Sequence, residues 1–198
     1  MADILSGKRV GFALTGSFCT FSRALPQLEA LCALGAEVTP IFSEVSFSTD
    51  TRFGKACDHV ARAEAACARN AIHTQAQAEP IGPKKLLDLL VVAPLTGATL
   101  SRAALGLTDS CVALSIKAQL RNERPVLVAV STNDGLAACG ECLGKLMGRR
   151  NVYFVPFGQD DPMGKPTSLV AHMDLILPAA RLALMGQQMQ PMILGPAK

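Results

Sequence analysis

Continuous apolar runs and amphipathic segments alternate along the first part of the chain. Residues 8–14 form an apolar run typical of a strand buried on both faces of a sheet. Residues 22–34 carry leucines three apart along one helical face, and Gly35 suits the end of that helix. Residues 37–42 predict a second strand. The chain therefore begins as strand, helix, strand.

The same alternation continues towards the C-terminus. Further helices are predicted at 51–69, 99–105, 110–121, 136–147 and 174–185. Further strands are predicted at 87–93, 126–130 and 151–156. The polar stretch 70–83 looks the least ordered, and the tail 187–198 is predicted to be loose. This pattern predicts an α/β fold, a doubly wound parallel sheet with right-handed crossovers and helices on both faces.

Length and charge narrow the class of protein. The 198 residues, 49% of them hydrophobic, fit a single domain, 1–198. The net charge of +3 comes from 19 basic and 16 acidic residues without a basic block, so nucleic acid is not expected as a partner. The N-terminus lacks the order of a signal peptide, and no apolar run reaches the roughly 20 residues of a membrane span. We therefore expect a cytoplasmic protein with no membrane partner.

The cysteines predict neither a disulfide framework nor a metal site. Seven cysteines stand at irregular spacing, an odd number that favours free thiols. Cys139 and Cys142 form a Cys-x-x-Cys pair, but no second pair of ligands completes a zinc site. On a helix the two thiols lie one turn apart without a shared role, so we predict no metal.

Small polar residues follow the predicted strands. In doubly wound sheets, ligands bind beyond the carboxyl ends of the strands, near the point where the strand order reverses. Uncharged hydroxyls and amides there suit a planar ligand with polar edges, although ordinary turn and cap chemistry explains each segment taken singly. The candidate binding residues at these ends are Thr15, Gly16, Ser17, Phe18, Ser43, Pro94, Thr96, Thr99, Ser131, Thr132 and Asn133.

The turn 15–18 joins the first strand to a helix and is a candidate phosphate site, because backbone N–H groups can converge on an anion there. It is not Gly-x-Gly-x-x-Gly, since Gly11 and Gly16 are five apart, nor a Walker A loop, since Phe18 and Cys19 replace the required Lys and Ser/Thr. One phosphate therefore fits better than a dinucleotide or a nucleoside triphosphate. A plain glycine turn with a serine cap remains the alternative.

The polar loop before His172 is the other candidate for chemistry. It contains Lys165 and several groups able to hold carboxylates, although His172 could equally cap a helix or face an interface. No nucleophile elbow accompanies a Ser-His-Asp set, which disfavours hydrolase chemistry.

Several segments resemble the B subunits of bacterial dipicolinate synthases, and the likeness covers nearly the whole chain. They are 82–88 (Gly-Pro-Lys-Lys-Leu-Leu-Asp), 93–97 (Ala-Pro-Leu-Thr-Gly), 107–109 (Leu-Thr-Asp), 129–134 (Ala-Val-Ser-Thr-Asn-Asp), 153–162 (Tyr-Phe-Val-Pro-Phe-Gly-Gln-Asp-Asp-Pro) and 168–174 (Ser-Leu-Val-Ala-His-Met-Asp). This family is related to the flavin-dependent cysteine decarboxylases. The resemblance implies a Rossmann-like, flavodoxin-like fold that binds FMN between the protomers of a trimer, with the phosphate at 15–18.

The chain departs from the decarboxylases at their own motifs. Ala98 stands where their Pro-Ala-Ser-Ala-Asn-Thr motif has its Asn, and only Asn133 survives from Pro-x-Met-Asn-x-x-Met-Trp. Their histidine before the third strand has no counterpart, because 80–83 lies there. Cysteine decarboxylation is therefore a poor assignment.

The resemblance implies a share in the NAD(P)-dependent oxidation of dihydrodipicolinate to dipicolinate, in the mother cell of a sporulating bacterium. The partner that the resemblance implies is the dinucleotide-binding A subunit of dipicolinate synthase, which is expected to carry NADP. This chain then either supplies the flavin or shapes the dicarboxylate site, with Arg102, Lys165 and His172 as candidate carboxylate contacts and catalytic residues. The alternatives are a decarboxylase-like flavoenzyme without a partner and a non-catalytic scaffold subunit.

Overall fold

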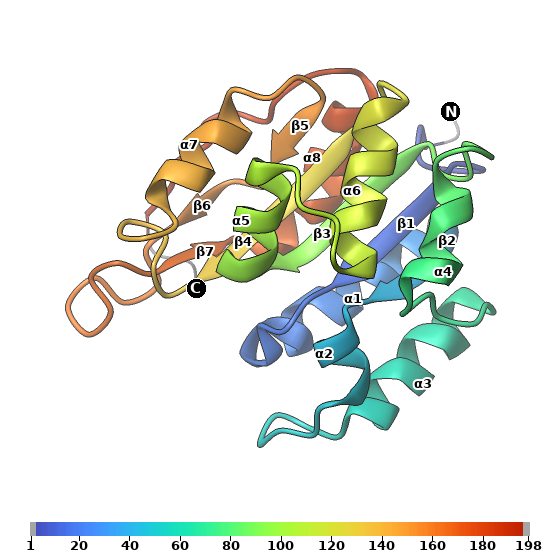
Figure 1. Cartoon of the computed structure of the whole chain (residues 1–198), viewed down its shortest axis with the longest axis horizontal. Coiled ribbons are helices and arrows are strands. Elements are labelled where there is room, and N and C mark those ends of the chain that lie inside the picture. Colours follow the sequence, from blue (N-terminus) through green and yellow to red (C-terminus); the bar gives the residue numbers. More distant parts are fainter. Residues whose placement is uncertain (1–2, 196–198) are drawn as a thin grey trace.

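A mostly parallel sheet forms the centre of the computed structural model, which describes residues 3–195 (Figure 1). The strands of that part are β1 Arg9–Leu14, β2 Glu37–Phe42, β3 Leu89–Leu95, β4 Val126–Thr132, β5 Val152–Phe154, β6 Phe157–Gly158 and β7 Leu169–Ala171. They lie in the order β2-β1-β3-β4-β7-β6, with β5 beside the first half of β4. Strands β1 to β5 pair in parallel, whereas β7 is antiparallel to both β4 and β6.

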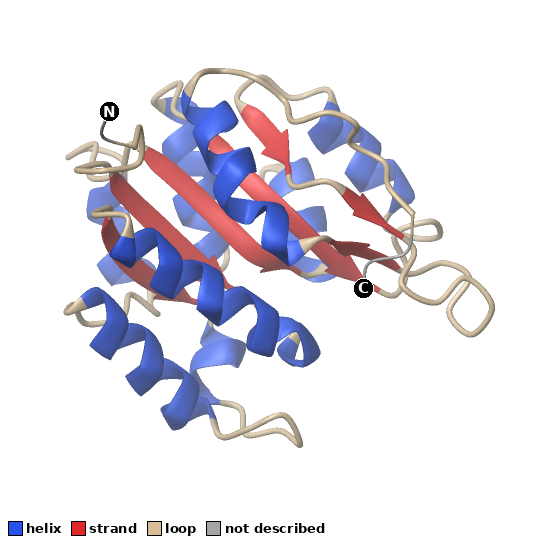
Figure 2. Cartoon of the chain, turned by 180° about the vertical axis from the view of Figure 1, so that it is seen from behind, coloured by secondary structure: helices blue, strands red, loops and turns tan. Residues whose placement is uncertain are grey.

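Helices cover both faces of this sheet (Figures 1 and 2). They are α1 Phe21–Ala33, α2 Glu44–Ser48, α3 Ala56–Cys67, α4 Gln75–Ala78, α5 Gly97–Leu105, α6 Cys111–Arg121, α7 Gly140–Met147 and α8 Ile176–Leu184, with short 3₁₀ turns η1 Phe18–Thr20, η2 Glu79–Ile81 and η3 Met173–Leu175. Helices α1 and α8 pack on one face, and α5 and α6 on the other. The predicted doubly wound α/β fold is confirmed.

Burial explains why the central strands could be recognised. Every residue of β3 is buried, and so is all of β1 after its first residue, because helices cover both sides of these strands. The strand order reverses between β1 and β3, since β2 lies on one side of β1 and the later strands on the other. Their carboxyl ends are where a ligand is expected in such a sheet.

Two predicted helices begin a full turn or more later than expected. The one predicted from residue 51 begins at Ala56, because 51–54 closes a separate tight turn and Asp50 accepts a hydrogen bond from the Ala56 N–H (2.8 Å). The one predicted from residue 136 begins at Gly140, because the N–H groups of Ala137 and Cys139 both donate to the Asp134 carbonyl. Local turn hydrogen bonds replace the first helical turn in both places.

The stretch 70–83, predicted to be the least ordered, contains α4 and η2. Thr74 caps α4, and its side chain and that of Gln77 satisfy each other's backbone N–H groups in a capping box. A short α2 also precedes the turn 51–54, where no separate helix was predicted.

The described part of the C-terminal tail is tied to the sheet, in contrast to the predicted loose tail. The Gln188 amide bonds both the N–H and the carbonyl of Phe154 at 2.8 Å. The Leu194 N–H donates to the Phe157 carbonyl (2.9 Å), so the tail runs beside β6. Residues 196–198 of the predicted tail lie outside the described residues. Within 3–195, no helix combines the length and apolar character needed to cross a membrane.

Candidate functional site

A cavity of about 540 Å³ opens at the carboxyl ends of β1, β3 and β4. This volume falls within the range of roughly 300–1,000 Å³ that small-molecule and cofactor sites occupy. The lining residues are Gly16, Ser17, Phe18, Cys19, Thr51, Arg52, Phe53, Thr96, Gly97, Ser131, Thr132, Asn133, Asp160, Lys165 and Val170. The cavity lies beside the reversal of strand order.

Most of the predicted binding residues meet in this cavity. Those that line it are Gly16, Ser17, Phe18, Thr96, Ser131, Thr132 and Asn133, together with Lys165 from the predicted carboxylate contacts. Those that do not line it are Thr15, Ser43, Pro94, Thr99, Arg102 and His172. Sequence reasoning missed the other lining residues, which are Cys19, Thr51, Arg52, Phe53, Gly97, Asp160 and Val170. Arg52, Phe53 and Asp160 belong to loops without a periodic pattern.

The buried side chain of Thr15 fixes the turn that follows β1. Its side chain is fully buried, and its hydroxyl donates to the Pro94 carbonyl (2.7 Å). The same oxygen accepts the Thr96 N–H (3.0 Å). Thr15 and Pro94 thus join the ends of β1 and β3, which fixes the two turns that face the cavity.

The turn after β1 presents unpaired donors. The Ser17 N–H donates to the Thr15 carbonyl (2.7 Å), but among the described residues the N–H groups of Gly16, Phe18 and Cys19 have no protein acceptor. The Ser17 hydroxyl lies 2.7 Å from the Ser131 hydroxyl, which joins this turn to the end of β4. Free amide donors beside hydroxyls form a suitable cradle for a phosphate.

Ser43 and Thr99 act as helix caps or support them. The Ser43 hydroxyl accepts a hydrogen bond from the Ser46 N–H (3.2 Å) at the start of α2. Ser43 and Ser46 are both buried. The Thr99 hydroxyl accepts a hydrogen bond from that of Thr96 (3.2 Å), whose side chain caps α5. Their contacts are those of cap residues rather than of cavity walls.

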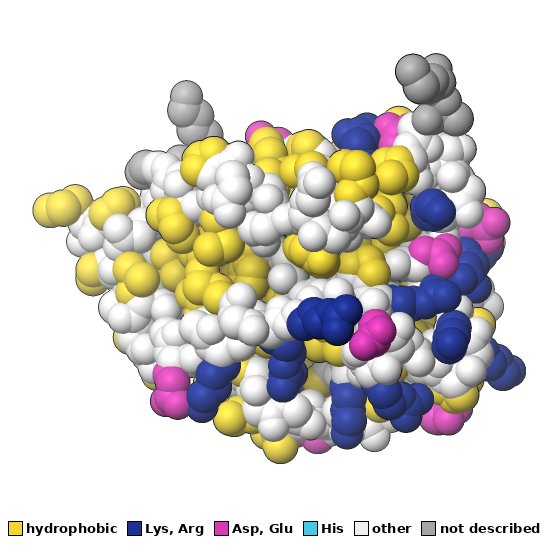
Figure 3. All heavy atoms as spheres, turned by 90° about the horizontal axis from the view of Figure 1, so that it is seen from above, with side chains coloured by type: hydrophobic (Ala, Val, Ile, Leu, Met, Phe, Trp, Pro, Cys, Tyr) yellow, Lys and Arg dark blue, Asp and Glu magenta, His cyan; other side chains and the backbone are white. Residues whose placement is uncertain are grey.

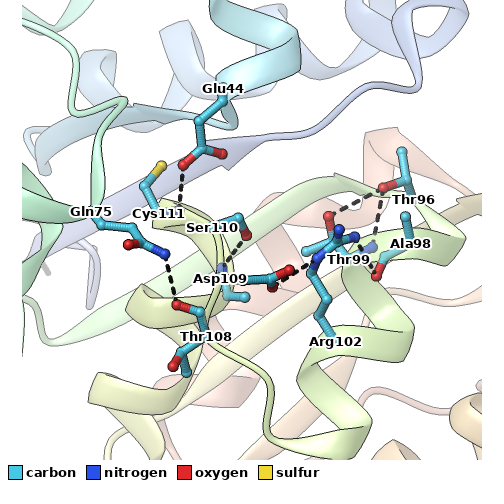
Figure 4. Close-up of polar contacts among 11 residues, drawn as sticks. Glu44, Gln75, Thr96, Ala98, Thr99, Arg102, Thr108, Asp109, Ser110 and Cys111 are labelled. Atoms are coloured by element: carbon cyan, nitrogen blue, oxygen red, sulfur yellow. Dashed lines mark hydrogen bonds and ion pairs between the residues drawn. The ribbon is translucent and has the colours of Figure 1, made fainter.

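Arg102 is not part of the cavity lining, and Figure 4 shows its guanidinium beside Asp109 and the Ala98 carbonyl. Its guanidinium pairs with Asp109 (Nε to Oδ1, 2.9 Å) and donates to the Ala98 carbonyl (3.3 Å). In the same view the Glu44 carboxylate accepts the Cys111 N–H at the start of α6 (2.9 Å). Arg102 therefore stabilises α5 and the loop after it.

His172 also lies outside the cavity lining. It stands at the N-cap of η3, and its Nε2 is 3.1 Å from the Gly195 carbonyl. The His172 side chain makes no capping hydrogen bond to η3 and instead contacts the C-terminal tail.

A polar cluster supports the cavity wall after β4. The Asp134 carboxylate accepts hydrogen bonds from the Thr132 hydroxyl and from the Cys139 thiol (3.2 Å to sulfur). The bond from Thr132, followed by the one from Cys139, lowers the pKa of Asp134 below its ordinary value. Burial, together with the nearby carboxylate, raises the pKa of the Cys139 thiol. The cluster orders the loop that carries Asn133.

Lys165 reaches the cavity from the β6–β7 loop. Its ammonium lies 3.1 Å from Asp160, whose other oxygen accepts the Ser168 hydroxyl (2.7 Å). Burial raises the pKa of Asp160, but the bonds from Ser168 and Lys165 outweigh burial and lower it overall. The same contact with Asp160 raises the pKa of Lys165. One cation and one anion are therefore held together at this wall.

Comparison with known proteins identifies the family. Residues 2–138 match the family model named Flavoprotein. The chain is 48% identical over 189 residues to the B subunit of dipicolinate synthase from Bacillus subtilis (strain 168), covering 96% of this chain and 94% of that protein. The chain belongs to the family of dipicolinate synthase B subunits. The crystal structure of a family member from Bacillus halodurans is 44% identical, with a TM-score of 0.89 over 97% of this chain and 98% of that one.

More distant flavoproteins share the fold of this family. The FMN-dependent cysteine decarboxylase SpaF is 17% identical, with a TM-score of 0.63 over 91% of this chain and 99% of that chain. At this identity the likeness shows the fold alone. Flavoprotein membership rests on the family match, which covers the turns after β1, β3 and β4 that line the cavity.

A second hollow of about 410 Å³ lies between α5, α6 and the residues after α7. Its walls combine apolar residues with Lys117, Arg121, Arg149 and Arg150, and none of the predicted site residues lines it. Figure 3 shows one face of the molecule on which hydrophobic side chains fill the centre and Lys and Arg gather at one side. The predicted polar chemistry is concentrated in the 540 Å³ cavity instead.

Proposed function

We propose that the chain is the flavin-binding component of a dipicolinate synthase, working with a dinucleotide-binding A subunit that carries NADP. Together they oxidise dihydrodipicolinate to dipicolinate in the mother cell of a sporulating bacterium. Family membership supports the assignment. The observation that carries the flavin part is the donor cradle at the turn after β1, which opens into a cavity lined by hydroxyls and an amide.

The residues present fit FMN. The free N–H groups of Gly16, Phe18 and Cys19 suit a single phosphate. Ser131, Thr132 and Asn133 offer uncharged donors and acceptors to the polar edge of a planar ring. When bound, FMN supplies a centre that accepts or passes on a hydride equivalent.

Lys165 is the predicted carboxylate contact that the cavity retains. Its ammonium is oriented by Asp160 and still has donors free, because an ammonium carries three N–H groups. The role of the chain towards the substrate is therefore to hold and orient a carboxylate beside the flavin site.

FMN titration tests the flavin part. Gly16→Val should weaken FMN binding more than tenfold, because its side chain stands among the phosphate donors. The position has room for a Cβ, which meets only ordinary contacts at 3.7 Å, from Phe18 and Val45. Quenching of flavin fluorescence measures the affinity. The matched control is Gly144→Ala in α7, where an added Cβ meets nothing within 4 Å.

A wild-type chain that remains colourless and takes up no added FMN would remove the flavin and favour a scaffold role. Equal FMN affinity in wild type and Gly16→Val would instead show that the phosphate binds elsewhere. The shared reaction is tested separately by supplying dihydrodipicolinate to the two proteins together and then omitting each in turn. Full activity of the partner protein without this chain would contradict a catalytic share for this chain.

We also propose a trimer-based homo-oligomer. Leu105 (58%) and Leu107 (51%), at the end of α5, are two neighbouring apolar side chains that stay exposed on this chain and could pack against another copy. Sedimentation of the purified chain should give a mass in multiples of three, and a monomer at micromolar concentration would contradict this assembly.

A further inference from the structure

The turn 51–54 forms part of the cavity although it is distant in sequence from the strand ends. It connects α2 to α3, and Thr51, Arg52 and Phe53 all line the cavity. Arg52 is exposed, and Phe53 is 44% exposed. Neither the cation nor the aromatic ring is needed to close the turn. Both side chains are therefore available to contact a ligand in the cavity.

The turn is held in a defined shape. Thr51 and Gly54 exchange backbone hydrogen bonds (3.0 and 3.1 Å), and the Phe53 N–H donates to the Thr51 hydroxyl (3.1 Å). Gly54 has a φ of +134°, and a side chain there would come within 2.7 Å of the His59 ring. Because Gly54 has no side chain, the turn can pack closely on α3. This packing holds the backbone of Arg52 and Phe53 in a fixed position.

The charge around the cavity is uneven. Arg52 and Lys165 are the cations of the lining and Asp160 is its carboxylate. Asp160 is already engaged by Lys165 and Ser168. Within residues 3–195 no carboxylate lies at ion-pair distance from Arg52, whose guanidinium rests over the Phe53 ring at 4.9 Å. The cavity therefore carries a positive charge left over for an anionic ligand.

We propose that the turn 51–54 recognises the substrate: Arg52 binds one carboxylate of a planar dicarboxylate, Lys165 binds the other, and Phe53 packs against the ring. The inference rests on the proposed function and adds Arg52 and Phe53 to it. A guanidinium suits a carboxylate because it can donate two parallel hydrogen bonds. The phosphate of FMN is the competing anion, but the uncharged donors at Gly16, Phe18 and Cys19 already suit that group.

Binding of pyridine-2,6-dicarboxylate to the full chain saturated with FMN tests the proposal. Arg52→Gln should weaken the binding of pyridine-2,6-dicarboxylate about tenfold, and Arg52→Lys should weaken it less. The affinity for pyridine-2-carboxylate, which has a single carboxylate, should fall less in Arg52→Gln than the affinity for the dicarboxylate. FMN affinity should not change. The matched control is Arg150→Gln, an equal charge change at a side chain that is 82% exposed and outside the cavity.

The possible outcomes separate this inference from the proposed function. Unchanged dicarboxylate affinity in Arg52→Gln overturns the inference and leaves the flavin assignment intact. A loss of FMN affinity without a loss of dicarboxylate affinity also overturns it, since Arg52 would then serve the phosphate. A wild-type chain that binds FMN but no dicarboxylate removes the substrate-holding part of the proposed function, and the inference with it.

Discussion

Gly97→Ala should destabilise the chain by about 1–3 kcal/mol, because it overpacks the contact between the ends of β3 and β4. A Cβ at Gly97 would lie 2.6 Å from the Thr132 hydroxyl, 2.7 Å from the Cys139 sulfur and 2.9 Å from the Asp134 carboxylate. These three atoms belong to one hydrogen-bonded cluster, so none can move without weakening its neighbours. Chemical denaturation measures the loss, and FMN titration should show weaker binding as well.

The sign of the stability change in Gly97→Ala distinguishes overpacking, which destabilises the chain, from helix propensity, which would stabilise it. Gly97 is the first residue of α5, where alanine is intrinsically the better helix former. Gly144→Ala, inside α7 with open space around the added atom, should stabilise the chain by about 0.5–1 kcal/mol. Adding Cys139→Ala to Gly97→Ala should recover part of the loss by removing one clash. A stabilising Gly97→Ala would disprove the close approach.

Asp88→Asn should cost about 2 kcal/mol of stability, because one carboxylate joins the starts of neighbouring strands. Its oxygens accept from the Arg9 guanidinium (2.6 and 3.1 Å), from the Arg9 N–H (3.0 Å) and from Arg124 (2.8 Å). Arg9 begins β1 and Arg124 lies just before β4. Removing the charge leaves the two guanidinium groups without their common partner.

The pH dependence of the same variant gives an independent check. The hydrogen bond from Arg9, with further help from Arg124, lowers the pKa of Asp88 from 3.8 to about 2 in the folded chain. A lowered carboxyl pKa stabilises the fold above the unfolded value and is lost as pH falls through the folded one. The shift corresponds to roughly 2 kcal/mol at neutral pH.

Denaturation of wild type and Asp88→Asn should therefore differ most above about pH 5 and converge near pH 2. Glu123→Gln is the control, because its ion pair with Arg150 is long (3.6 Å) and exposed. That change should cost less than about 0.5 kcal/mol. A stability difference for Asp88→Asn that stays constant over this pH range would contradict the role of its charge.

The strands and the edge of the sheet that carries the cavity could be predicted from the sequence. Buried parallel strands are continuous apolar runs, so the pattern alone marked β1, β3 and β4. Ligand-binding polar residues follow such strands directly in sequence, which is why Gly16, Thr96 and Ser131 were found together with their neighbours.

Sequence reasoning could not decide what each polar side chain contacts. Thr15 and Arg102 have the chemistry of binding residues, but tertiary contacts bury Thr15 between two strands and pair Arg102 with Asp109. The contacts of these two side chains depend on residues that are distant in sequence or lie across a loop. A local sequence pattern does not predict such contacts.

The sequence by itself determined the α/β architecture and the donor turn after β1, because both follow from short-range periodicity and turn chemistry. Only the tertiary structure brought the turn 51–54 and the β6–β7 loop to the same cavity, and with them Arg52, Phe53 and Asp160. Loops lack a repeating pattern, and their place is set by the helices and strands that they connect. The charge of the cavity was therefore decided by the fold.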